Sequence, residues 1–314
     1  MRIGIREYAG IFLCSAAAFL VLAVGVQAAE PPFVAGVLRR DGVIIPFGVF
    51  DGKSWSNHWP KPTLDLTVPT DVGSVPTRWW GDAGPQATWQ IWSGAAEPQT
   101  VKVVQPDWVD VHCVRQIGLH TDYRTGQLPP PPSEQPYPKD GLAIAPARPI
   151  ERVALVPPAG PDANSMLVAL KEAFNRAERQ PAGKVDLPLN RDAREDQDPR
   201  IEALYSHGSE PRVYYVEATR EYQRFGSHEC QIMSFGTGWF VSEQGRFRPL
   251  AMAVDVLGCD RRDASYMLPL GVVRAGTRVF WLVQFSGWDR ERYAVIEPKL
   301  KDVDAVLNVW GGGC

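Results

Sequence analysis

Asp110 and His112 are the two residues of this sequence whose types and spacing best fit acid–base chemistry. They lie two positions apart in the segment 108–119, which has the alternating pattern of a strand, so both side chains would leave the same face of a sheet. A carboxylate beside an imidazole orients the ring and favours its charged form, as a general base requires. On the solvated face of a sheet the same pair would be no more than a surface hydrogen bond, and the sequence does not identify a third catalytic partner.

Tryptophan is concentrated in the N-terminal half of the chain. Seven of the 11 tryptophans lie there, namely Trp55, Trp59, Trp79, Trp80, Trp89, Trp92 and Trp108. An exposed indole ring can stack on a sugar ring, and Trp55, Trp59 and Trp108 are therefore candidate ligand-binding residues for a glycan. The alternative is that these rings fill the core of a β-rich domain, where their large apolar surface is buried.

The cysteines predict two disulfide bonds. Four of the five cysteines follow the N-terminal apolar segment, and an even number is compatible with complete pairing in an exported protein. The dipeptide Gln244-Gly245 has the composition of a two-residue hairpin turn, and regular pairing around it sets Cys230 opposite Cys259, within disulfide reach. We expect this pair, and the pair Cys113–Cys314 follows by elimination. We expect no metal site and no cofactor.

The first 28 residues have the pattern of a secretory signal peptide. Arg2 and Arg6 make the start positive, residues 11–26 are apolar and uncharged, and Ala28 ends a cleavage site of small residues. We therefore expect an exported protein, periplasmic or extracellular, with no membrane span after cleavage. The alternative is a retained membrane anchor, although the apolar run is shorter than the roughly 20 residues that a spanning helix needs.

The composition excludes some classes of partner and of chain. The formal net charge is −3, and a mildly acidic chain without a basic stripe is not expected to bind nucleic acid. Hydrophobic residues make up 45% of the chain and charged residues 22%, which is typical of a globular protein rather than a disordered one. The chain is long enough to bury a sizeable core.

The elements that must carry these residues are expected to be mainly antiparallel strands. Three hairpins are expected, each with a glycine-containing turn between strands rich in β-branched and aromatic residues, at 33–50, 231–257 and 266–286. Further strands are expected at 88–92, 100–104, 108–119, 152–156, 212–218 and 292–297. One clear helix is expected near 165–179, and the polar segment 181–211 is expected to be an exposed loop. The fold class is therefore mainly β, or α+β with little α.

Proline suggests how the chain divides into domains. The run Pro129 to Pro132 favours extended polyproline geometry and cannot enter the interior of a sheet. We therefore expect a Trp-rich β domain over residues 29–125, a Pro-rich linker over 126–150 and a β-rich domain with one helix over 151–314. The alternative is that the proline-rich segment is a strap across one continuous domain.

These features favour a binding or structural protein over an enzyme. The leading hypothesis is a non-catalytic module of the cell envelope or the extracellular space, with a glycan or another envelope component as its partner. The alternative is a secreted hydrolase that uses Asp110 and His112 as an acid–base pair. Exposed, aligned rings would favour binding, whereas a pocket that joins His112 to further titratable groups would favour catalysis.

Overall fold

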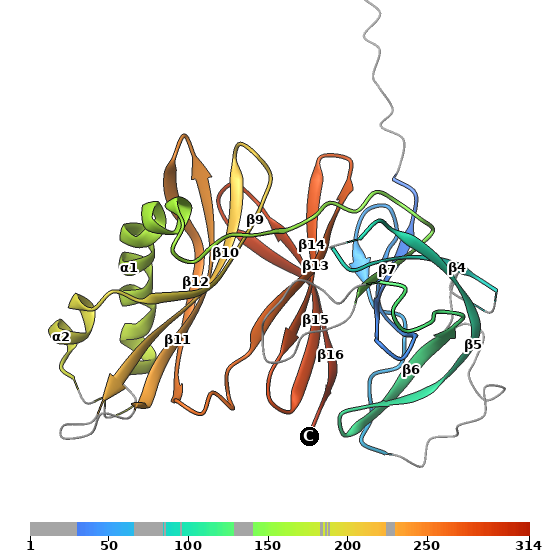
Figure 1. Cartoon of the computed structure of the whole chain (residues 1–314), viewed down its shortest axis with the longest axis horizontal. Coiled ribbons are helices and arrows are strands. Elements are labelled where there is room, and N and C mark those ends of the chain that lie inside the picture. Colours follow the sequence, from blue (N-terminus) through green and yellow to red (C-terminus); the bar gives the residue numbers. More distant parts are fainter. Residues whose placement is uncertain are drawn as a thin grey trace, which may run out of the picture.

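The computed structural model of the chain describes residues 30–65, 84, 86–94, 96–128, 141–182, 185, 187, 189–223 and 230–314. The signal peptide expected over residues 1–28 lies outside this range. The protein is mostly β, with antiparallel sheets and one long helix, which confirms the expected fold class. A helix, an outer sheet, a middle sheet and a barrel follow one another along the molecule (Figure 1). None of the helices in the described ranges is long and apolar enough to cross a membrane.

The N-terminal strands build the barrel. In the ring order β1–β7–β4–β5–β6–β2, each strand pairs with the next, β2 pairs back onto β1, and the short β3 pairs with the end of β2. The strands are β1 (Phe33–Leu38), β2 (Val43–Phe50), β3 (Trp55–Ser56), β4 (Thr88–Trp92), β5 (Gln99–Val111), β6 (Val114–Thr121) and β7 (Gly141–Ala145). Alternate side chains point into the barrel, where Ile44, Trp89 and Leu119 are fully buried.

The middle sheet is buried on both faces at its centre, whereas its edge strand β16 (Val303–Gly313) is partly exposed. It contains, in spatial order, β13 (Tyr266–Ala275), β14 (Arg278–Ser286), β15 (Arg290–Pro298) and β16 (Val303–Gly313). On one face Phe280 and Leu282 pack against outward-pointing residues of the barrel such as Ile144. On the other face Trp281 and Val283 pack against the outer sheet. Because consecutive residues of a strand point to opposite faces, a sheet between two layers needs apolar residues at consecutive positions.

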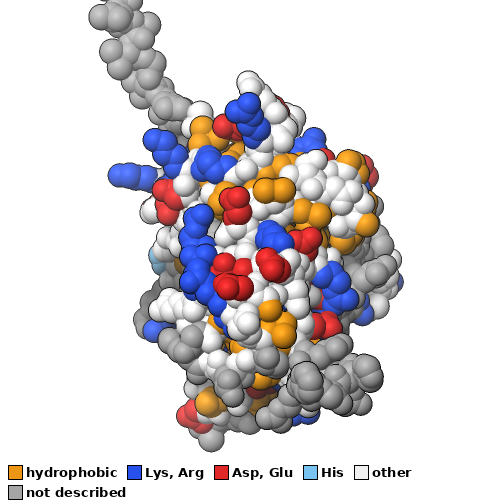
Figure 2. Space-filling model, turned by 90° about the vertical axis from the view of Figure 1, so that its left-hand side faces the viewer, with side chains coloured by type: hydrophobic (Ala, Val, Ile, Leu, Met, Phe, Trp, Pro, Cys, Tyr) orange, Lys and Arg blue, Asp and Glu red, His pale blue; other side chains and the backbone are white. Residues whose placement is uncertain are grey.

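The outer sheet carries the helices. It contains β8 (Ala154–Leu155), β9 (Arg200–His207), β10 (Arg212–Gln223), β11 (Cys230–Glu243) and β12 (Arg246–Gly258), in the order β12-β11-β10-β9-β8. Helix α1 (Pro161–Ala182) includes the expected helix and packs Leu170 and Phe174 onto the sheet, and the short α2 (Arg191–Asp196) follows it. Figure 2 shows this side of the molecule, where acidic and basic side chains are interspersed with apolar ones.

The hairpin of β11 and β12 has the turn expected from the sequence. Gln244 and Gly245 have φ values of 52° and 74°, and two positive φ angles match the twist of the strands that such a turn connects. A bulge after Trp239 then shifts the register by one residue, so that Ile232 pairs with Gly258. The local turn signal therefore predicts the hairpin, and the bulge changes which residues lie opposite each other beyond it.

The strand expected over residues 108–119 is in fact a hairpin. Strand β5 ends at Val111 and β6 begins at Val114, and these two residues pair with each other. His112, between them, has a φ of 52°, which is uncommon for a residue other than glycine. The alternation that placed Asp110 and His112 on one face therefore ends before His112.

The proline-rich segment is followed directly by a strand of the barrel. Strand β7 lies within the range 126–150 that was expected to be a linker, and it pairs with both β1 and β4. Residues 129–140 lie outside the described ranges. The middle sheet shares one hydrophobic cluster with the barrel and another with the outer sheet. Apolar packing is therefore continuous across the layers, and the division of the chain into folding domains stays a prediction.

Candidate functional site

Asp110 lies near the tip of the β5–β6 hairpin, directly opposite Arg115. The Arg115 guanidinium donates hydrogen bonds to both carboxylate oxygens, with a distance of 2.9 Å from Nε to Oδ1 and of 3.3 Å from Nη2 to Oδ2. These hydrogen bonds lower the pKa of Asp110, because they stabilise its charged form. The structure therefore does not bring Asp110 and His112 together as an acid–base pair.

His112 faces a different acid, which comes from the C-terminal half of the chain. Its Nε2 lies 3.5 Å from Oε2 of Glu291 on β15. Glu291 is buried and accepts a hydrogen bond from the Tyr293 hydroxyl, which fixes the carboxylate against the middle sheet. An acid–imidazole contact thus exists here, but it joins the tip of the hairpin to the middle sheet.

Two further contacts join the same hairpin to the end of β16. Cys113 forms a disulfide with Cys314, with a Cα–Cα distance of 5.0 Å. The buried Gln116 donates a hydrogen bond from Nε2 to the carbonyl oxygen of Gly311 at 2.9 Å. We call these contacts, together with the contact between His112 and Glu291, the hairpin clamp. Cys113, which follows His112 in the sequence, is bonded to Cys314 and is therefore not a free thiol. The hairpin clamp thus joins two layers of the protein.

The hairpin clamp brings together no metal cluster among the described residues, and the cavity described below is lined by other residues. Among the residues that the structure describes, no group of three or more His, Cys, Asp or Glu side chains is placed to hold a metal ion. A cavity of about 30 Å³ lies where the three sheets meet, lined in part by Ser93, Arg152 and Tyr205. This volume suits about one water molecule, and it is far below the several hundred Å³ of a typical ligand pocket.

The structure places the candidate tryptophans in or against the core, which is the alternative arrangement that the sequence offered. Trp55 and Trp59 are each 8% exposed. Trp55 packs at 5.1 Å from Phe33 and 5.6 Å from Phe280, between ring centroids, where the barrel meets the middle sheet. Trp59 belongs to the core of the barrel, and the half-buried Trp108 packs against that core. These rings fill the layers because few other side chains offer as much apolar surface.

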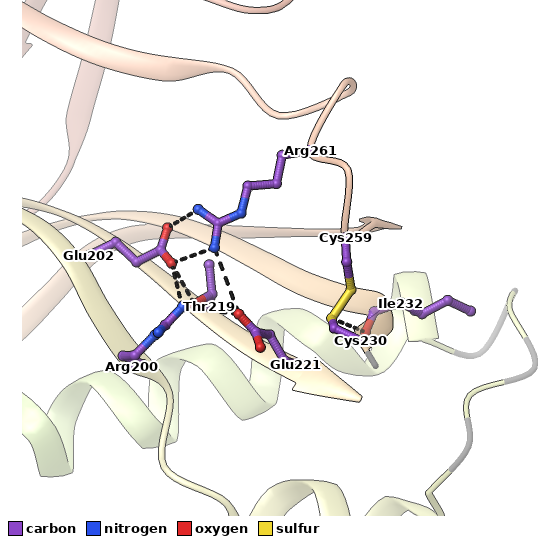
Figure 3. The surroundings of a disulfide bond; sticks show 8 residues. All are labelled: Arg200, Glu202, Thr219, Glu221, Cys230, Ile232, Cys259 and Arg261. Atoms are coloured by element: carbon purple, nitrogen blue, oxygen red, sulfur yellow. Dashed lines mark hydrogen bonds and ion pairs between the residues drawn. A yellow bond between two sulfur atoms is a disulfide. The ribbon is translucent and has the colours of Figure 1, made fainter. Parts of the chain in front are cut away.

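The second disulfide, Cys230–Cys259, lies beside a cluster of charged residues (Figure 3). Arg261 donates hydrogen bonds to both carboxylate oxygens of Glu202 at 2.8 Å. Arg200 lies between Glu202 and Glu221, at 2.9 and 3.0 Å from their carboxylate oxygens. Both disulfides are the pairs expected from the sequence. The charged groups satisfy one another, so this cluster presents no unpaired charge to a ligand.

A buried ion pair lies between α1 and the outer sheet. Nη1 of Arg220 is 2.8 Å from Oε2 of Glu178, and the two side chains are 1% and 2% exposed. Arg220 also donates to Asn175 and to the backbone oxygen of Gln197. Both terminal nitrogens of Arg220 are engaged in this way, whereas its buried Nε has no hydrogen-bond partner. The pair is buried beneath the helix and offers no accessible acid.

A second buried acid lies between the outer and middle sheets. Glu217 is fully buried, and its Oε1 accepts a hydrogen bond from the backbone N–H of Met267 at 2.6 Å. Burial raises the pKa of Glu217 to about 8, so its carboxyl is mostly protonated at neutral pH. A perturbed pKa can mark a catalytic acid, but this group has no exposed surface at which a substrate could meet it.

A row of three side chains, two exposed and one half-buried, crosses the middle sheet, and sequence reasoning missed it. Phe285 on β14 pairs with Arg292 on β15, and Arg292 pairs with Trp310 on β16. The Arg292 guanidinium lies 4.2 Å above the centroid of the Phe285 ring. Trp310 is 44% exposed, and Asn308 on the same face is also exposed. We call Phe285, Arg292 and Trp310 the cross-strand row.

The cross-strand row lies on the face of the middle sheet that is turned toward the outer sheet. Trp281 and Val283 on this face are buried against the outer sheet, whereas Trp310 at the edge strand β16 remains exposed. The alternation of residues 303–310 was the signal that could have found the row, because it predicts a further strand carrying an exposed indole.

Comparison with known proteins adds no relative: no family model, no curated protein and no solved structure matches this chain.

Proposed function

We propose that this protein is an exported, non-catalytic binding module whose ligand is a saccharide of the cell envelope or the extracellular space. Two disulfides are compatible with an oxidising compartment, and the pattern of residues 1–28 supports export. Sequencing the N-terminus of the exported protein tests the second point, and a new N-terminus at Ala29 is expected. A product that still begins at Met1 would contradict the cleavage site.

The exposed indole of Trp310 carries the proposal. A flat aromatic face packs well against the C–H face of a sugar ring, and an exposed ring on a strand loses little conformational freedom when it binds. Most other large aromatic side chains in the described ranges are buried in the layers, including Trp55 and Trp89. Trp310 is one of two exposed tryptophans among the described residues, at 44% against 62% for Trp288, and its place beside Arg292 in the cross-strand row sets it apart.

The hydrolase hypothesis has less support. Asp110 is engaged by Arg115, and His112 is engaged by Glu291 within the hairpin clamp. A general base needs access to the proton that it removes. The His112 side chain is 26% exposed, but its Nε2 lies 3.5 Å from the buried carboxylate of Glu291. The cavity at the junction of the three sheets suits about one water molecule.

The proposal is tested by affinity electrophoresis of the purified chain, with both disulfides formed, in gels that contain neutral or acidic polysaccharides. Retardation by at least one polysaccharide is expected, and W310A should abolish it. L64A is the matched control, because Leu64 on the barrel side of the molecule is 65% exposed and its removal also deletes an exposed apolar group. The proposal is wrong if no polysaccharide retards the chain, or if W310A and L64A behave alike.

A further inference from the structure

Arg292 occupies the centre of the cross-strand row. Its direct partners in the register are Phe285 on one side and Trp310 on the other. Directly paired residues of antiparallel strands have Cβ atoms roughly 5 Å apart, so Arg292 has a half-buried ring on one neighbouring strand and an exposed ring on the other. The stack on Phe285, at 4.2 Å, holds the planar group on the surface of the sheet.

The charge of Arg292 has no acidic partner among the described residues. Other arginines of the middle sheet are paired: Arg278 with Glu297 at 2.7 Å, and Arg274 with Glu151. Hydrogen bonds to these carboxylates raise the pKa of Arg274 and Arg278, whereas no carboxylate of the described residues acts on the pKa of Arg292. Partial desolvation lowers this pKa most, the interaction with Tyr215 raises it, and the nearby positive charge of Arg290 lowers it again. A partly desolvated guanidinium beside a like charge makes a locally positive site.

The neighbouring Arg290 does not neutralise this site. Its Nη2 donates a hydrogen bond to the backbone oxygen of Asp263 at 2.7 Å, which fixes the side chain without supplying a negative charge. Arg290 and Arg292 are two positions apart on β15 and therefore project from the same face. Arg292 is exposed, and an anion that binds there would supply the charge-assisted hydrogen bonds that no described acidic side chain gives it.

We infer that the ligand of the cross-strand row is an acidic saccharide, with its carboxylate on Arg292 and its sugar ring on Trp310. This inference rests on the proposed function and names the chemical class of the ligand. In a uronic acid the carboxylate carbon is bonded directly to the ring, so the acid and the ring face are a few ångströms apart, and Arg292 and Trp310 are direct neighbours in the strand register, with Cβ atoms roughly 5 Å apart. The guanidinium fork matches both carboxylate oxygens, which a lysine could not do.

The shape of the row favours a sugar over an acidic peptide. A peptide carboxylate would satisfy Arg292 but would bring no flat C–H face to the exposed indole of Trp310. The polar side chain of Asn308, exposed on the same face of β16, adds a donor and an acceptor of the kind that sugar hydroxyls use. Polyglutamate is therefore the appropriate competitor in a binding test.

The experiment is isothermal titration calorimetry of the whole chain with oligogalacturonate, with the same oligosaccharide fully methyl-esterified, and with polyglutamate. Oligogalacturonate should bind, and the neutral ester should bind at least about tenfold more weakly, since charge-assisted hydrogen bonds are about twice as strong as neutral ones. R292Q should bring the two affinities together by weakening oligogalacturonate alone. R292K, which keeps the charge but lacks the fork, should retain part of the preference.

The matched control is R39Q. Arg39 lies beyond the end of β1 in the barrel and is paired with Asp41 at 3.1 Å, so its loss should leave both affinities unchanged. Circular dichroism and the thermal midpoint of each variant identify a change in folding. If R292Q proves misfolded, the ester comparison on the unaltered chain still decides the question.

The outcomes separate this inference from the proposed function. Binding of the acid and the ester with equal affinity would keep saccharide binding and overturn the role of Arg292. Binding of polyglutamate in preference to oligogalacturonate would overturn the sugar as the occupant. If no saccharide of any charge binds, the proposed function itself fails and the inference fails with it.

Discussion

Replacing Cys113 and Cys314 together by serine should destabilise the protein more than replacing Cys230 and Cys259 together. The first disulfide joins residues 201 positions apart, and the second joins residues 29 positions apart. In the chain-entropy model a cross-link stabilises the fold by restricting the unfolded chain, which gives about 5.3 kcal/mol for the longer loop and about 3.6 kcal/mol for the shorter one. The expected difference in unfolding free energy is therefore about 1.7 kcal/mol.

Urea and thermal denaturation of the two double variants measure this difference. For domains of 150–250 residues, 1 kcal/mol shifts the thermal midpoint by about 2–4 °C, so the two midpoints should differ by about 3 °C or more. Non-reducing electrophoresis checks that the remaining disulfide is intact in each variant. If C230S/C259S is destabilised as much as C113S/C314S, loop length does not set the contribution of these disulfides and the reasoning is refuted.

Three further expectations concern the layers. E178Q should lower the unfolding free energy in urea by about 3–5 kcal/mol, because it leaves the buried Arg220 without its carboxylate; a loss below about 1 kcal/mol would contradict this. Burial raises the pKa of Glu217 to about 8 from its ordinary 4.5, so the folded protein retains a proton that the unfolded chain releases. Wild-type stability should therefore fall relative to E217Q from about pH 4.5 to about pH 8, and parallel stability profiles would refute the assignment. Residues 29–125 expressed alone lack β7 and should show no cooperative unfolding transition, which calorimetry can check.

The sequence predicted the structure best where the determining interactions are local. The turn Gln244-Gly245 has both residues at positive φ, a property that the glycine and its neighbour indicate without any tertiary information. The pair Cys230–Cys259 follows from that hairpin, although the bulge after Trp239 shifts the register by one residue. A one-residue shift leaves the two Cα atoms 5.9 Å apart, which a disulfide can span. The expected pair therefore forms in spite of the shifted register.

Long-range contacts explain what the sequence did not predict. The turn at His112 contains no glycine, asparagine or aspartate, and contacts with distant parts of the chain, the disulfide to Cys314 and Glu291 on β15, hold it in place. Strand β9 lies in the polar segment 181–211 that was expected to be a loop. It pairs with β10 and β8 and carries the buried Leu204. In both places the tertiary environment outweighs the local signal.

The cross-strand row was invisible in the sequence for a related reason. Phe285, Arg292 and Trp310 are separated by 7 and 18 positions, and only the register of β14, β15 and β16 makes them neighbours. Counting tryptophans in the sequence also does not show which of them are exposed, so it could not distinguish the buried Trp55 from the exposed Trp310. Exposure is a property of the layers, and it is decided by which strands the outer sheet covers.

The hairpin clamp connects the residues first suspected of catalysis to the row that we propose binds a saccharide. Glu291, which contacts His112, directly precedes Arg292, and Gly311, which accepts the hydrogen bond of Gln116, directly follows Trp310. The barrel therefore holds β15 and β16 at positions adjacent to both proposed ligand contacts. A site whose backbone is fixed from a neighbouring layer needs little further ordering when a ligand binds, which preserves affinity. On this reasoning His112 and Gln116 act on binding by positioning the two strands, without touching the ligand themselves.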